Sequence, residues 1–289
     1  MTNFPERNTF MKKLKDRVAL ITGGGRGLGQ AIALAYAKEG ANVAICGRNI
    51  GVLEETARQI EAEGVEALPL TCDVSSSAQV HAMFEKLLNH FGTIDILVNN
   101  AGIFRSDPAG AKDRINHLDL VTKPGPRYSL GITKSLTDEQ WHDMFRVNVD
   151  GTFYCTREAL RVMESKHYGK IVNIVSISGI SSRSSHSPNY AAAKGAIVAL
   201  TRSLGHEVAG AGITVNAIAP GYLMTEEFKN GLYNAMNEDQ RQRLLQLVPL
   251  GRLSTVDDYT PLAVFLASSD SDYLVGQIIS PNGGVVIEF

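Results

Sequence analysis

The chain has 289 residues, and its 44% hydrophobic content is enough for the core of one large domain or two smaller ones. Its 28 basic and 30 acidic residues leave a formal net charge of −2, which argues against nucleic acid or an anionic membrane as the main partner. No apolar run reaches transmembrane length, and the polar start of the chain lacks the apolar region of a secretory signal. We expect a flexible tail over residues 1–14 and a cytoplasmic location.

The cysteines Cys46, Cys72 and Cys155 are far apart in the sequence and show no spacing typical of metal ligands or of a CxxC motif. Two of them end apolar, strand-like runs. Their pattern predicts buried free thiols in a reducing compartment rather than a disulfide framework, and it offers no metal site.

Short runs rich in valine and isoleucine alternate with amphipathic helical stretches, which is typical of a parallel sheet with helices on both faces. The predicted strands are 17–22, 42–46, 66–71, 94–99, 170–176, 213–219 and 277–280. The predicted helices are 27–39, 49–63, 75–91, 137–165, 188–209 and 255–267, the fourth capped by Thr137 with Gln140. No repeat interrupts this order, so we expect one doubly wound Rossmann domain over 15–289 with a seven-stranded parallel sheet.

One segment, 103–140, contains several prolines and glycines and no sustained period. A loop of this length is uncommon unless it is functional or disordered, so we interpret it as an insertion near a site. Its cations could bind a carboxylate or phosphate of a substrate, although neighbouring acids favour a solvated loop of mixed charge. These cations are Arg105, Arg114, Lys123 and Arg127.

A glycine-rich turn, GGGRGLG, joins the first predicted strand to the first predicted helix. Gly23, Gly27 and Gly29 follow a GxxxGxG spacing, which lets backbone N–H groups and a helix N-terminus approach a pyrophosphate without obstruction from a Cβ atom. A merely flexible glycine turn is the alternative. The position directly after the first strand favours a nucleotide site.

The residues after the second strand distinguish NAD from NADP, because an acid there binds the ribose 2′-hydroxyl whereas a base accommodates a 2′-phosphate. Arg48 stands at this place, no acid follows before Glu54, and Arg26 in the glycine turn supplies a second cation. The sequence therefore predicts NADP(H) rather than NAD(H). The alternative is that both arginines are solvated surface charges.

Small and polar residues follow other predicted strands, where the carboxyl ends of parallel strands form a ligand crevice. Asp73 and Val74 follow the third strand, and Asp73 could accept a hydrogen bond from adenine or cap the next helix. Further candidates to line a cofactor are Asn99, Ala101, Gly102, Pro220, Gly221 and Thr225.

Tyr190 and Lys194 are four residues apart in a predicted helix, so both side chains project from one face. A neighbouring ammonium favours phenolate, which would lower the pKa of the tyrosine toward the range of a general acid/base. Ser176 ends the fifth strand where this phenol would lie, and its hydroxyl could donate to a carbonyl oxygen of a substrate. Five other serines between 178 and 185 compete with it, and only its position at the strand end favours Ser176.

In this order the motifs resemble those of the short-chain dehydrogenase/reductase family, from about residue 15 to the C-terminus. The matching stretches are TGGGRGLG (22–29), CDV (72–74), NNAG (99–102), the asparagine of VNVDG (Asn148), Ser176, the YxxxK pair and PGYLMT (220–225). Each motif alone is weak, whereas their joint order and spacing are highly specific.

This resemblance implies a catalytic tetrad of Asn148, Ser176, Tyr190 and Lys194. Ser176 would orient a carbonyl, Tyr190 would exchange the proton, and Lys194 would hold the nicotinamide ribose and depress the pKa of Tyr190. Asn148 would anchor a water in a proton relay, or serve as a helix-interior amide bonded to backbone. The implied cofactor-binding residues are Gly23, Arg26, Gly27, Leu28, Gly29, Arg48, Asp73, Val74, Asn99, Ala101, Gly102, Pro220, Gly221 and Thr225, with Tyr190 and Lys194.

The resulting hypothesis is an NADP(H)-dependent oxidoreductase that interconverts a secondary alcohol and a ketone, and the resemblance also implies a homotetramer. An NAD(H)-preferring enzyme of the same type is one alternative, and a nucleotide-sensing protein that has lost its chemistry is another. The 103–140 segment could in addition bind a partner protein.

Overall fold

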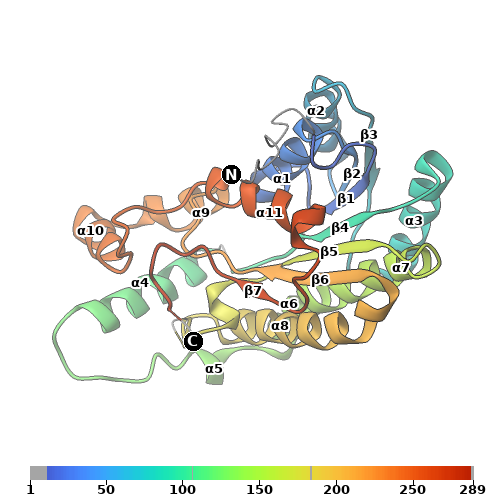
Figure 1. Cartoon of the computed structure of the whole chain (residues 1–289). Coiled ribbons are helices and arrows are strands. Elements are labelled where there is room, and N and C mark those ends of the chain that lie inside the picture. The colour runs from blue at the N-terminus through green and yellow to red at the C-terminus, as the bar shows by residue number, and fades with distance from the viewer. Residues whose placement is uncertain (1–11, 106, 183, 288–289) are drawn as a thin grey trace, which may run out of the picture.

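The computed structural model describes residues 12–105, 107–182 and 184–287 (Figure 1). Within them, seven parallel strands form one sheet in the order β3-β2-β1-β4-β5-β6-β7. They are β1 (Val18–Thr22), β2 (Asn42–Gly47), β3 (Ala67–Thr71), β4 (Ile96–Asn99), β5 (Gly169–Ile174), β6 (Ile213–Ile218) and β7 (Ile278–Ile279). The chain reverses its direction across the sheet between β1 and β4, so the carboxyl ends of these strands border the crevice that binds ligands in such sheets.

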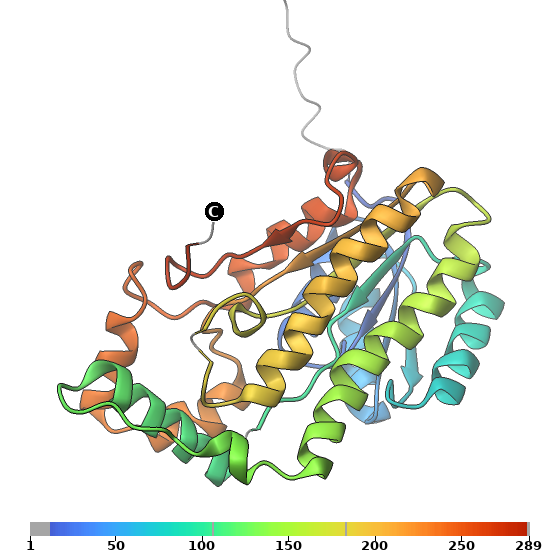
Figure 2. The same cartoon turned by 90° about the horizontal axis from the view of Figure 1, so that it is seen from below.

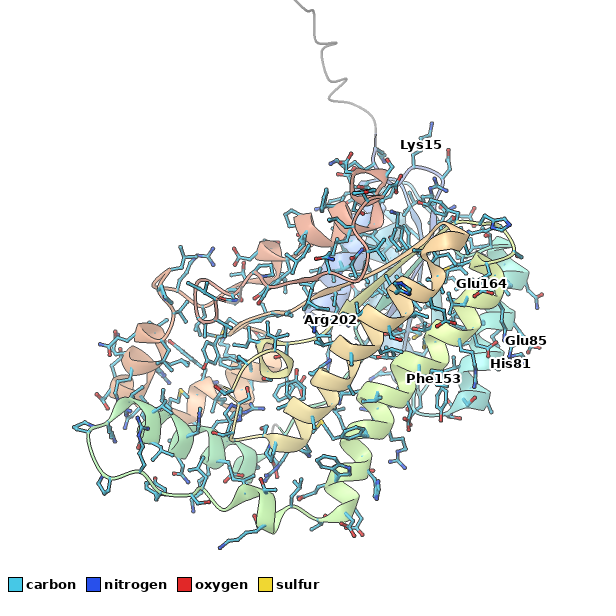
Figure 3. The ribbon with its side chains drawn as sticks, turned by 60° about the horizontal axis from the view of Figure 1, so that its bottom comes forward. Lys15, His81, Glu85, Phe153, Glu164 and Arg202 are labelled. Carbon is cyan, nitrogen blue, oxygen red and sulfur yellow. The ribbon has the colours of Figure 1, made fainter. Side chains whose placement is uncertain are left out.

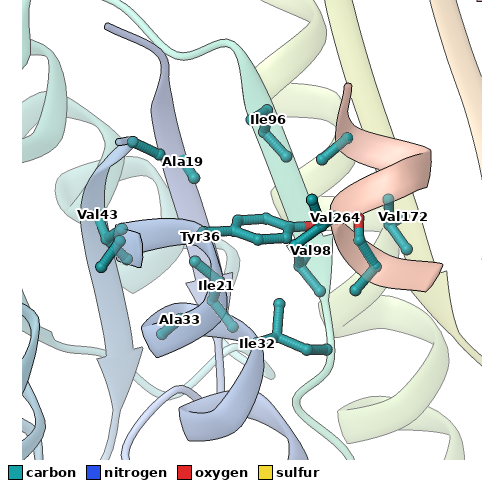
Figure 4. Close-up of a cluster of buried hydrophobic side chains, with 14 of the residues drawn as sticks. Ala19, Ile21, Ile32, Ala33, Tyr36, Val43, Ile96, Val98, Val172 and Val264 are labelled. Atoms are coloured by element: carbon teal, nitrogen blue, oxygen red, sulfur yellow. Dashed lines mark hydrogen bonds between the residues drawn. The ribbon is translucent and has the colours of Figure 1, made fainter. Parts of the chain in front are cut away.

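Helices cover both faces of the sheet, because alternate residues of each strand point to opposite sides. Ala19 and Ile21 lie on the face covered by α1 (Gly27–Lys38), α2 (Ile50–Glu61) and α11 (Thr260–Ala267), and Figure 4 shows part of this cluster. Leu20 lies on the opposite face, which is covered by α3 (Ser77–Phe91), α7 (Gly151–Met163) and α8 (Pro188–Val208). The predicted doubly wound α/β fold is confirmed, and each strand lies within two residues of its predicted bounds.

The 103–140 segment is not the structureless loop that the sequence predicts. It contains α4 (Pro108–Thr122) and the short α5 (Ile132–Ser135). The side chain of Asp107 caps α4 by accepting a hydrogen bond from the N–H of Gly110 at 3.0 Å, and Pro108 occupies the first turn.

Contacts with a distant part of the chain hold α4 in place. Two further helices follow β6, α9 (Glu226–Gly231) and α10 (Glu238–Gln246), and Figure 1 shows α10 beside α4. Ala111 and Leu118 of α4 belong to a buried cluster with Leu244 of α10. An ion pair of 2.7 Å between Arg243 and Asp119 joins the two helices. Figure 2 shows the two helices at the same end of the molecule, and their cluster also includes Ile177, which follows the end of β5.

The structure has helical residues through most of the predicted 137–165 range, but the helix type changes within it. It consists of α6 (Asp138–Phe145), a π-helical turn over Arg146–Asp150, and α7. Its start carries the predicted capping box of Thr137 and Gln140. The wider π turn has no signal in the sequence, and such turns are frequent at functional sites.

The expected N-terminal tail, 1–14, falls largely outside the described residues, which begin at Lys12. Leu14 already belongs to the folded chain, because its side chain is fully buried and its N–H donates to the carbonyl of Glu39 at 2.9 Å.

Cys46, Cys72 and Cys155 are buried free thiols, as predicted. Among the described residues, no helix is both long enough and apolar enough to cross a bilayer.

Tyr36 offers a test of how the core is held, because its hydroxyl donates to the carbonyl of Ala263 on α11 at 2.9 Å inside a fully buried cluster. We expect Tyr36→Phe to lower the free energy of unfolding by about 1–2 kcal/mol, since a buried hydrogen bond is lost. Urea denaturation monitored by circular dichroism measures the change. Tyr273→Phe, which removes a hydroxyl from a fully exposed side chain, is the matched control, and equal unfolding energies for the two variants would contradict the account.

Candidate active site

The turn between β1 and α1 is shaped by its glycines. Gly23 and Gly27 adopt φ angles of +64° and +57°, which L side chains rarely adopt. A Cβ atom on Gly29 would lie 2.3 Å from the carbonyl oxygen of Gly23, so no larger residue fits at this position without moving the backbone. The turn is therefore a cradle lined by backbone, as the sequence predicts.

The amide of Asn100 fixes this turn to the end of β4. Its Nδ2 donates to the carbonyl oxygens of Thr22 at 2.9 Å and Gly23 at 3.2 Å. In return, the hydroxyl of Thr22 accepts from the backbone N–H groups of Asn100 at 3.0 Å and Ala101 at 2.9 Å. Asn100 was not among the predicted site residues, although it is the second residue of the NNAG motif.

The neighbouring Asn99 is buried instead of facing the crevice. Its Nδ2 donates to Thr156 Oγ1 at 3.0 Å and to Asn173 Oδ1 at 2.9 Å, which commits the side chain to the interior between β4, β5 and α7. The predicted role of Asn99 in lining a cofactor would therefore fall to its backbone. Adjacent strand residues point to opposite faces, and here Asn100 has the outward position.

Ser176, Tyr190 and Lys194 meet at the carboxyl end of β5. The Lys194 ammonium is almost fully buried, donates to the carbonyl of Ile174 at 2.8 Å, and lies 5.7 Å from the centre of the Tyr190 ring. A hydrogen bond joins the side chains of Ser176 and Tyr190. Among the competing serines, Ser178 and Ser184 bond each other at 2.6 Å.

The pKa of Tyr190 differs from the prediction. Burial raises it above the ordinary value, while the hydrogen bond with Ser176 and the charge of Arg114 lower it in part. The expected lowering by Lys194 is not found, and burial dominates because the phenolate would have to form away from water. Burial also lowers the pKa of Lys194 to about 8. At neutral pH the pair therefore consists of a protonated phenol and an ammonium.

Asn148 lies in the middle of the π-helical turn and is fully buried. Its Nδ2 donates to the carbonyl oxygens of Met144 and Ile103, both at 3.0 Å, which matches the helix-interior role. Its Oδ1 has no hydrogen-bond partner among the described residues. A Cβ atom on Gly102 would lie 2.6 Å from this oxygen and 3.5 Å from Lys194 Nζ, so only glycine fits between the amide and the ammonium.

The two predicted NADP determinants lie at the surface. The Arg26 guanidinium is 79% exposed and lies 3.8 Å from Glu227, and Arg48 is exposed directly after β2. Asp73 accepts hydrogen bonds at one carboxylate oxygen from the N–H of Ser75 at 2.9 Å and its hydroxyl at 2.7 Å, and these bonds, with the charge of Arg48, hold its pKa low. Asp73 thus closes a turn before α3 and does not cap that helix, whose cap is Ser76.

The remaining predicted residues differ in what their side chains touch. Leu28 and Val74 are buried in the core, so their predicted roles would fall to their backbone. Thr225 caps α9. It also lies over the glycine turn, since a Cβ atom on Gly27 would be 3.8 Å from its methyl group.

Pro220 and Gly221 are held by contacts of the backbone. The carbonyl of Pro220 accepts a hydrogen bond from the N–H of Ile177 at 3.0 Å. A Cβ atom on Gly221 would meet the backbone of Asn282 at 3.0 Å.

The 103–140 segment brings two side chains to this site, Phe104, which the sequence did not single out, and Arg114, one of its candidate ligand-binding cations. Phe104 lies edge-on to Tyr190, with ring centres 6.5 Å apart. The Arg114 guanidinium of α4 lies 4.7 Å from the centre of the Phe104 ring. Since Arg114 lowers the pKa of Tyr190, the segment borders the reacting phenol, as its interpretation as an insertion near a site predicts.

Comparisons with known proteins agree with this geometry. The family model for the short chain dehydrogenase matches residues 17–232. The chain is 35% identical to the 3-oxoacyl-acyl-carrier-protein reductase FabG of Pseudomonas aeruginosa over 272 residues, which cover 94% of this chain and 98% of that protein. It is 33% identical to the Escherichia coli protein of the same name over 270 residues, covering 93% and 97%.

Solved structures give the same result. Levodione reductase superposes with a TM-score of 0.80 at 31% identity, covering 94% of this chain and 98% of its own. A short-chain type dehydrogenase/reductase from Mycobacterium marinum gives a TM-score of 0.79 at 30% identity, covering 96% and 98%. The chain therefore belongs to the short-chain dehydrogenase/reductase family and is an NAD(P)-dependent oxidoreductase acting between CH–OH and carbonyl groups.

Proposed function

We propose that this protein interconverts a secondary alcohol and a ketone with NADP(H), and that Asn148, Ser176, Tyr190 and Lys194 are its catalytic residues. The observation that carries the proposal is the convergence of the last three at the carboxyl end of β5, with the buried ammonium 5.7 Å from the phenol ring. Similarity to dehydrogenases and reductases supports the same chemistry.

The residues present fit a nicotinamide dinucleotide. The backbone cradle at the glycine turn excludes a Cβ atom at Gly29, which suits a pyrophosphate approaching N–H groups at the start of α1. Lys194 donates a single described hydrogen bond, to Ile174, and its ammonium has three protons, so donors remain for ribose hydroxyls. The bound nicotinamide would supply or accept the hydride.

The chain's own residues move the proton. The raised pKa of Tyr190 keeps its phenol protonated, so it can donate to the oxygen of a ketone that is being reduced. Ser176 would hold the same oxygen with its hydroxyl and orient the carbonyl. The nearby ammonium of Lys194 would stabilise the phenolate that remains.

Asn148 has the geometry for a second role beside its structural one. Its Oδ1 is a buried acceptor without a described partner, and it faces the small gap at Gly102 that Lys194 also borders. Burying an acceptor without a hydrogen bond is costly, so we infer that a water bonds it and returns protons to Lys194 and Tyr190.

Preference for NADP(H) over NAD(H) is part of the proposal. Arg48 is exposed where a 2′-phosphate would lie after β2, and Arg26 is exposed at the start of α1. Arg48 is close enough to Asp73 for its charge to help lower the pKa of that carboxyl group, so both residues lie at this end of the sheet. A phosphate would gain charge-assisted hydrogen bonds there that a ribose hydroxyl would not.

We further propose that residues 15–289 act as one catalytic domain, that four copies assemble, and that the protein works in the cytoplasm. Figure 3 shows α7 and α8 side by side on one surface, with Phe153 on the first and Arg202 on the second. The Phe153 side chain is 45% exposed, and a neighbouring subunit packed on this surface would cover it. These helices are the ones expected to pack between subunits.

Tyr190→Phe tests the proposed general acid. We expect kcat for carbonyl reduction to fall by about 100-fold to 10,000-fold, because the variant has no proton to donate, while the nucleotide still binds. Steady-state kinetics and nucleotide titration measure both properties, with Tyr273→Phe as the control. Normal turnover by Tyr190→Phe would overturn the mechanism, and a wild-type chain that binds nucleotide without turnover on any carbonyl would favour the nucleotide-sensing alternative.

The ionisation of Lys194 predicts a pH dependence. Below its pKa of about 8 the side chain is an ammonium, and as the pH rises through this value the positive charge beside the phenol is lost. We therefore expect kcat/KM for carbonyl reduction to fall above about pH 8. Lys194→Arg should move this decline to higher pH, because guanidinium stays protonated. A decline unchanged in Lys194→Arg would assign it to another group.

Arg48→Ala tests the choice of cofactor. We expect the ratio of NADPH to NADH affinity to fall by about 10-fold or more, because the hydrogen bonds to the 2′-phosphate are lost and those to the shared part of the nucleotide are not. Titration of both nucleotides measures the ratio, and Arg58→Ala removes a nearby exposed charge that is paired with Glu55. An unchanged ratio in Arg48→Ala would remove the assigned role.

A further inference from the structure

Of the four cations that the sequence analysis singles out in the 103–140 segment, three have an ion-pair or hydrogen-bond partner and one has neither. Arg105 pairs with Asp113 at 3.0 Å, Lys123 pairs with Asp119 at 3.0 Å, and Arg127 donates to the carbonyl of Leu120. Arg114 forms no ion pair and no hydrogen bond with any described residue, although it is half-buried and burial lowers its pKa. A desolvated guanidinium that lacks a counterion is costly, and a bound anionic ligand can supply that counterion.

The position of Arg114 explains what such a ligand would be. Its guanidinium lies on the ring of Phe104, and Phe104 lies on Tyr190, so one aromatic side chain separates the cation from the reacting phenol. Arg114 and Tyr190 are close enough that each alters the ionisation of the other. A molecule held at Tyr190 by its carbonyl would extend past Phe104 toward Arg114.

Two histidines lie near the guanidinium of Arg114. His117 follows Arg114 by one turn of α4, and its ring lies 5.1 Å from that of His186 in the loop before α8. Burial and the charge of Arg114 hold the pKa of His186 at about 3, and burial lowers that of His117. Both rings are neutral at physiological pH and can donate hydrogen bonds without adding charge.

We propose that Arg114 binds a carboxylate of the substrate, so that the preferred substrates are keto acids and the corresponding hydroxy acids. This inference rests on the proposed function, because it assigns the specificity of the same site. Arg114 acts as a binding residue and takes no part in proton or hydride transfer.

A carboxylate suits this position better than a phosphate. One guanidinium balances one negative charge and binds the two oxygens of a carboxylate with two parallel hydrogen bonds. The neutral histidines add no charge, and the positive potential of Arg105 is opposed by that of two acids, Glu227 and Asp107. Both acids lie near other arginines, Glu227 at 3.8 Å from Arg26 and Asp107 at 3.5 Å from Arg105. A doubly charged phosphate would be balanced only in part.

The experiment compares each acid with its own methyl ester, so that the carbon skeleton is constant and only the charge changes. The probes are acetoacetate, 4-oxopentanoate and 5-oxohexanoate, each with its methyl ester, and hydroxyacetone phosphate as the phosphate probe. Each is assayed with NADPH and with NADH. The measured quantity is the ratio of kcat/KM for the acid to kcat/KM for the ester. A general loss of activity lowers both values equally and therefore does not change this ratio.

We expect the wild-type chain to prefer at least one acid over its ester, and Arg114→Gln to lower this ratio by about 10-fold to 100-fold through KM of the acid. Arg114→Lys should lie between the two, because it keeps the charge but not the planar fork. Lys112→Gln removes an exposed charge from the same helix and should change the ratio by less than about twofold.

A ratio that is the same in wild type and Arg114→Gln overturns the inference. So does a wild-type chain that reduces the esters but not the acids, or one that prefers hydroxyacetone phosphate. In each of these cases turnover of a ketone leaves the proposed function standing. If Tyr190→Phe and the wild type are equally inactive on every charged and neutral probe, the proposed function itself fails.

Discussion

The clamp between Thr22 and Asn100 sets the geometry on which the site depends. It joins the ends of β1 and β4, the two strands between which the chain changes direction across the sheet. Because both strands are buried on both faces, their ends cannot shift without moving the core, and the clamp transmits this rigidity to the glycine turn. A backbone cradle built from flexible residues thereby keeps one shape. Rigid support beneath a site of this kind is what preorganised binding requires.

The chemistry of the site depends on two opposing effects of burial. Removing Tyr190 from water raises the pKa of its phenol, and removing Lys194 from water lowers that of its ammonium to about 8. Both shifts favour the neutral form of the group, so burial keeps the phenol protonated and brings the ionisation of the lysine close to physiological pH. The single hydrogen bond of Lys194 to Ile174 anchors the charge to the central strand, and Gly102 keeps space beside it.

Much of the fold and of the candidate site could be predicted from the sequence. The features that could not be predicted each have a physical reason. The strands buried on both faces produce continuous runs of valine and isoleucine, which local pattern detects. The exchange of roles between Asn99 and Asn100 depends on which face each residue of β4 presents, and a four-residue strand carries too little alternation to decide it. The packing of α4 depends on Arg243, 124 residues away from its partner Asp119, so no local period shows it. The π turn at Asn148 has no residue signature, and the pKa of Tyr190 depends on burial that only the assembled fold defines.

The separation of α4 and α10 from the sheet has a consequence for how this protein could diversify. The groups that would transfer the proton and hold the nucleotide come from strand ends, from α1 and α8 and from the π turn, whereas Arg114 comes from a helix that an ion pair and an apolar cluster fasten to α10. Substitutions of the residues around Arg114 would alter which molecules are accepted while leaving the strand ends and α8 in place. Substrate choice and reaction chemistry thus depend on different stretches of the same chain.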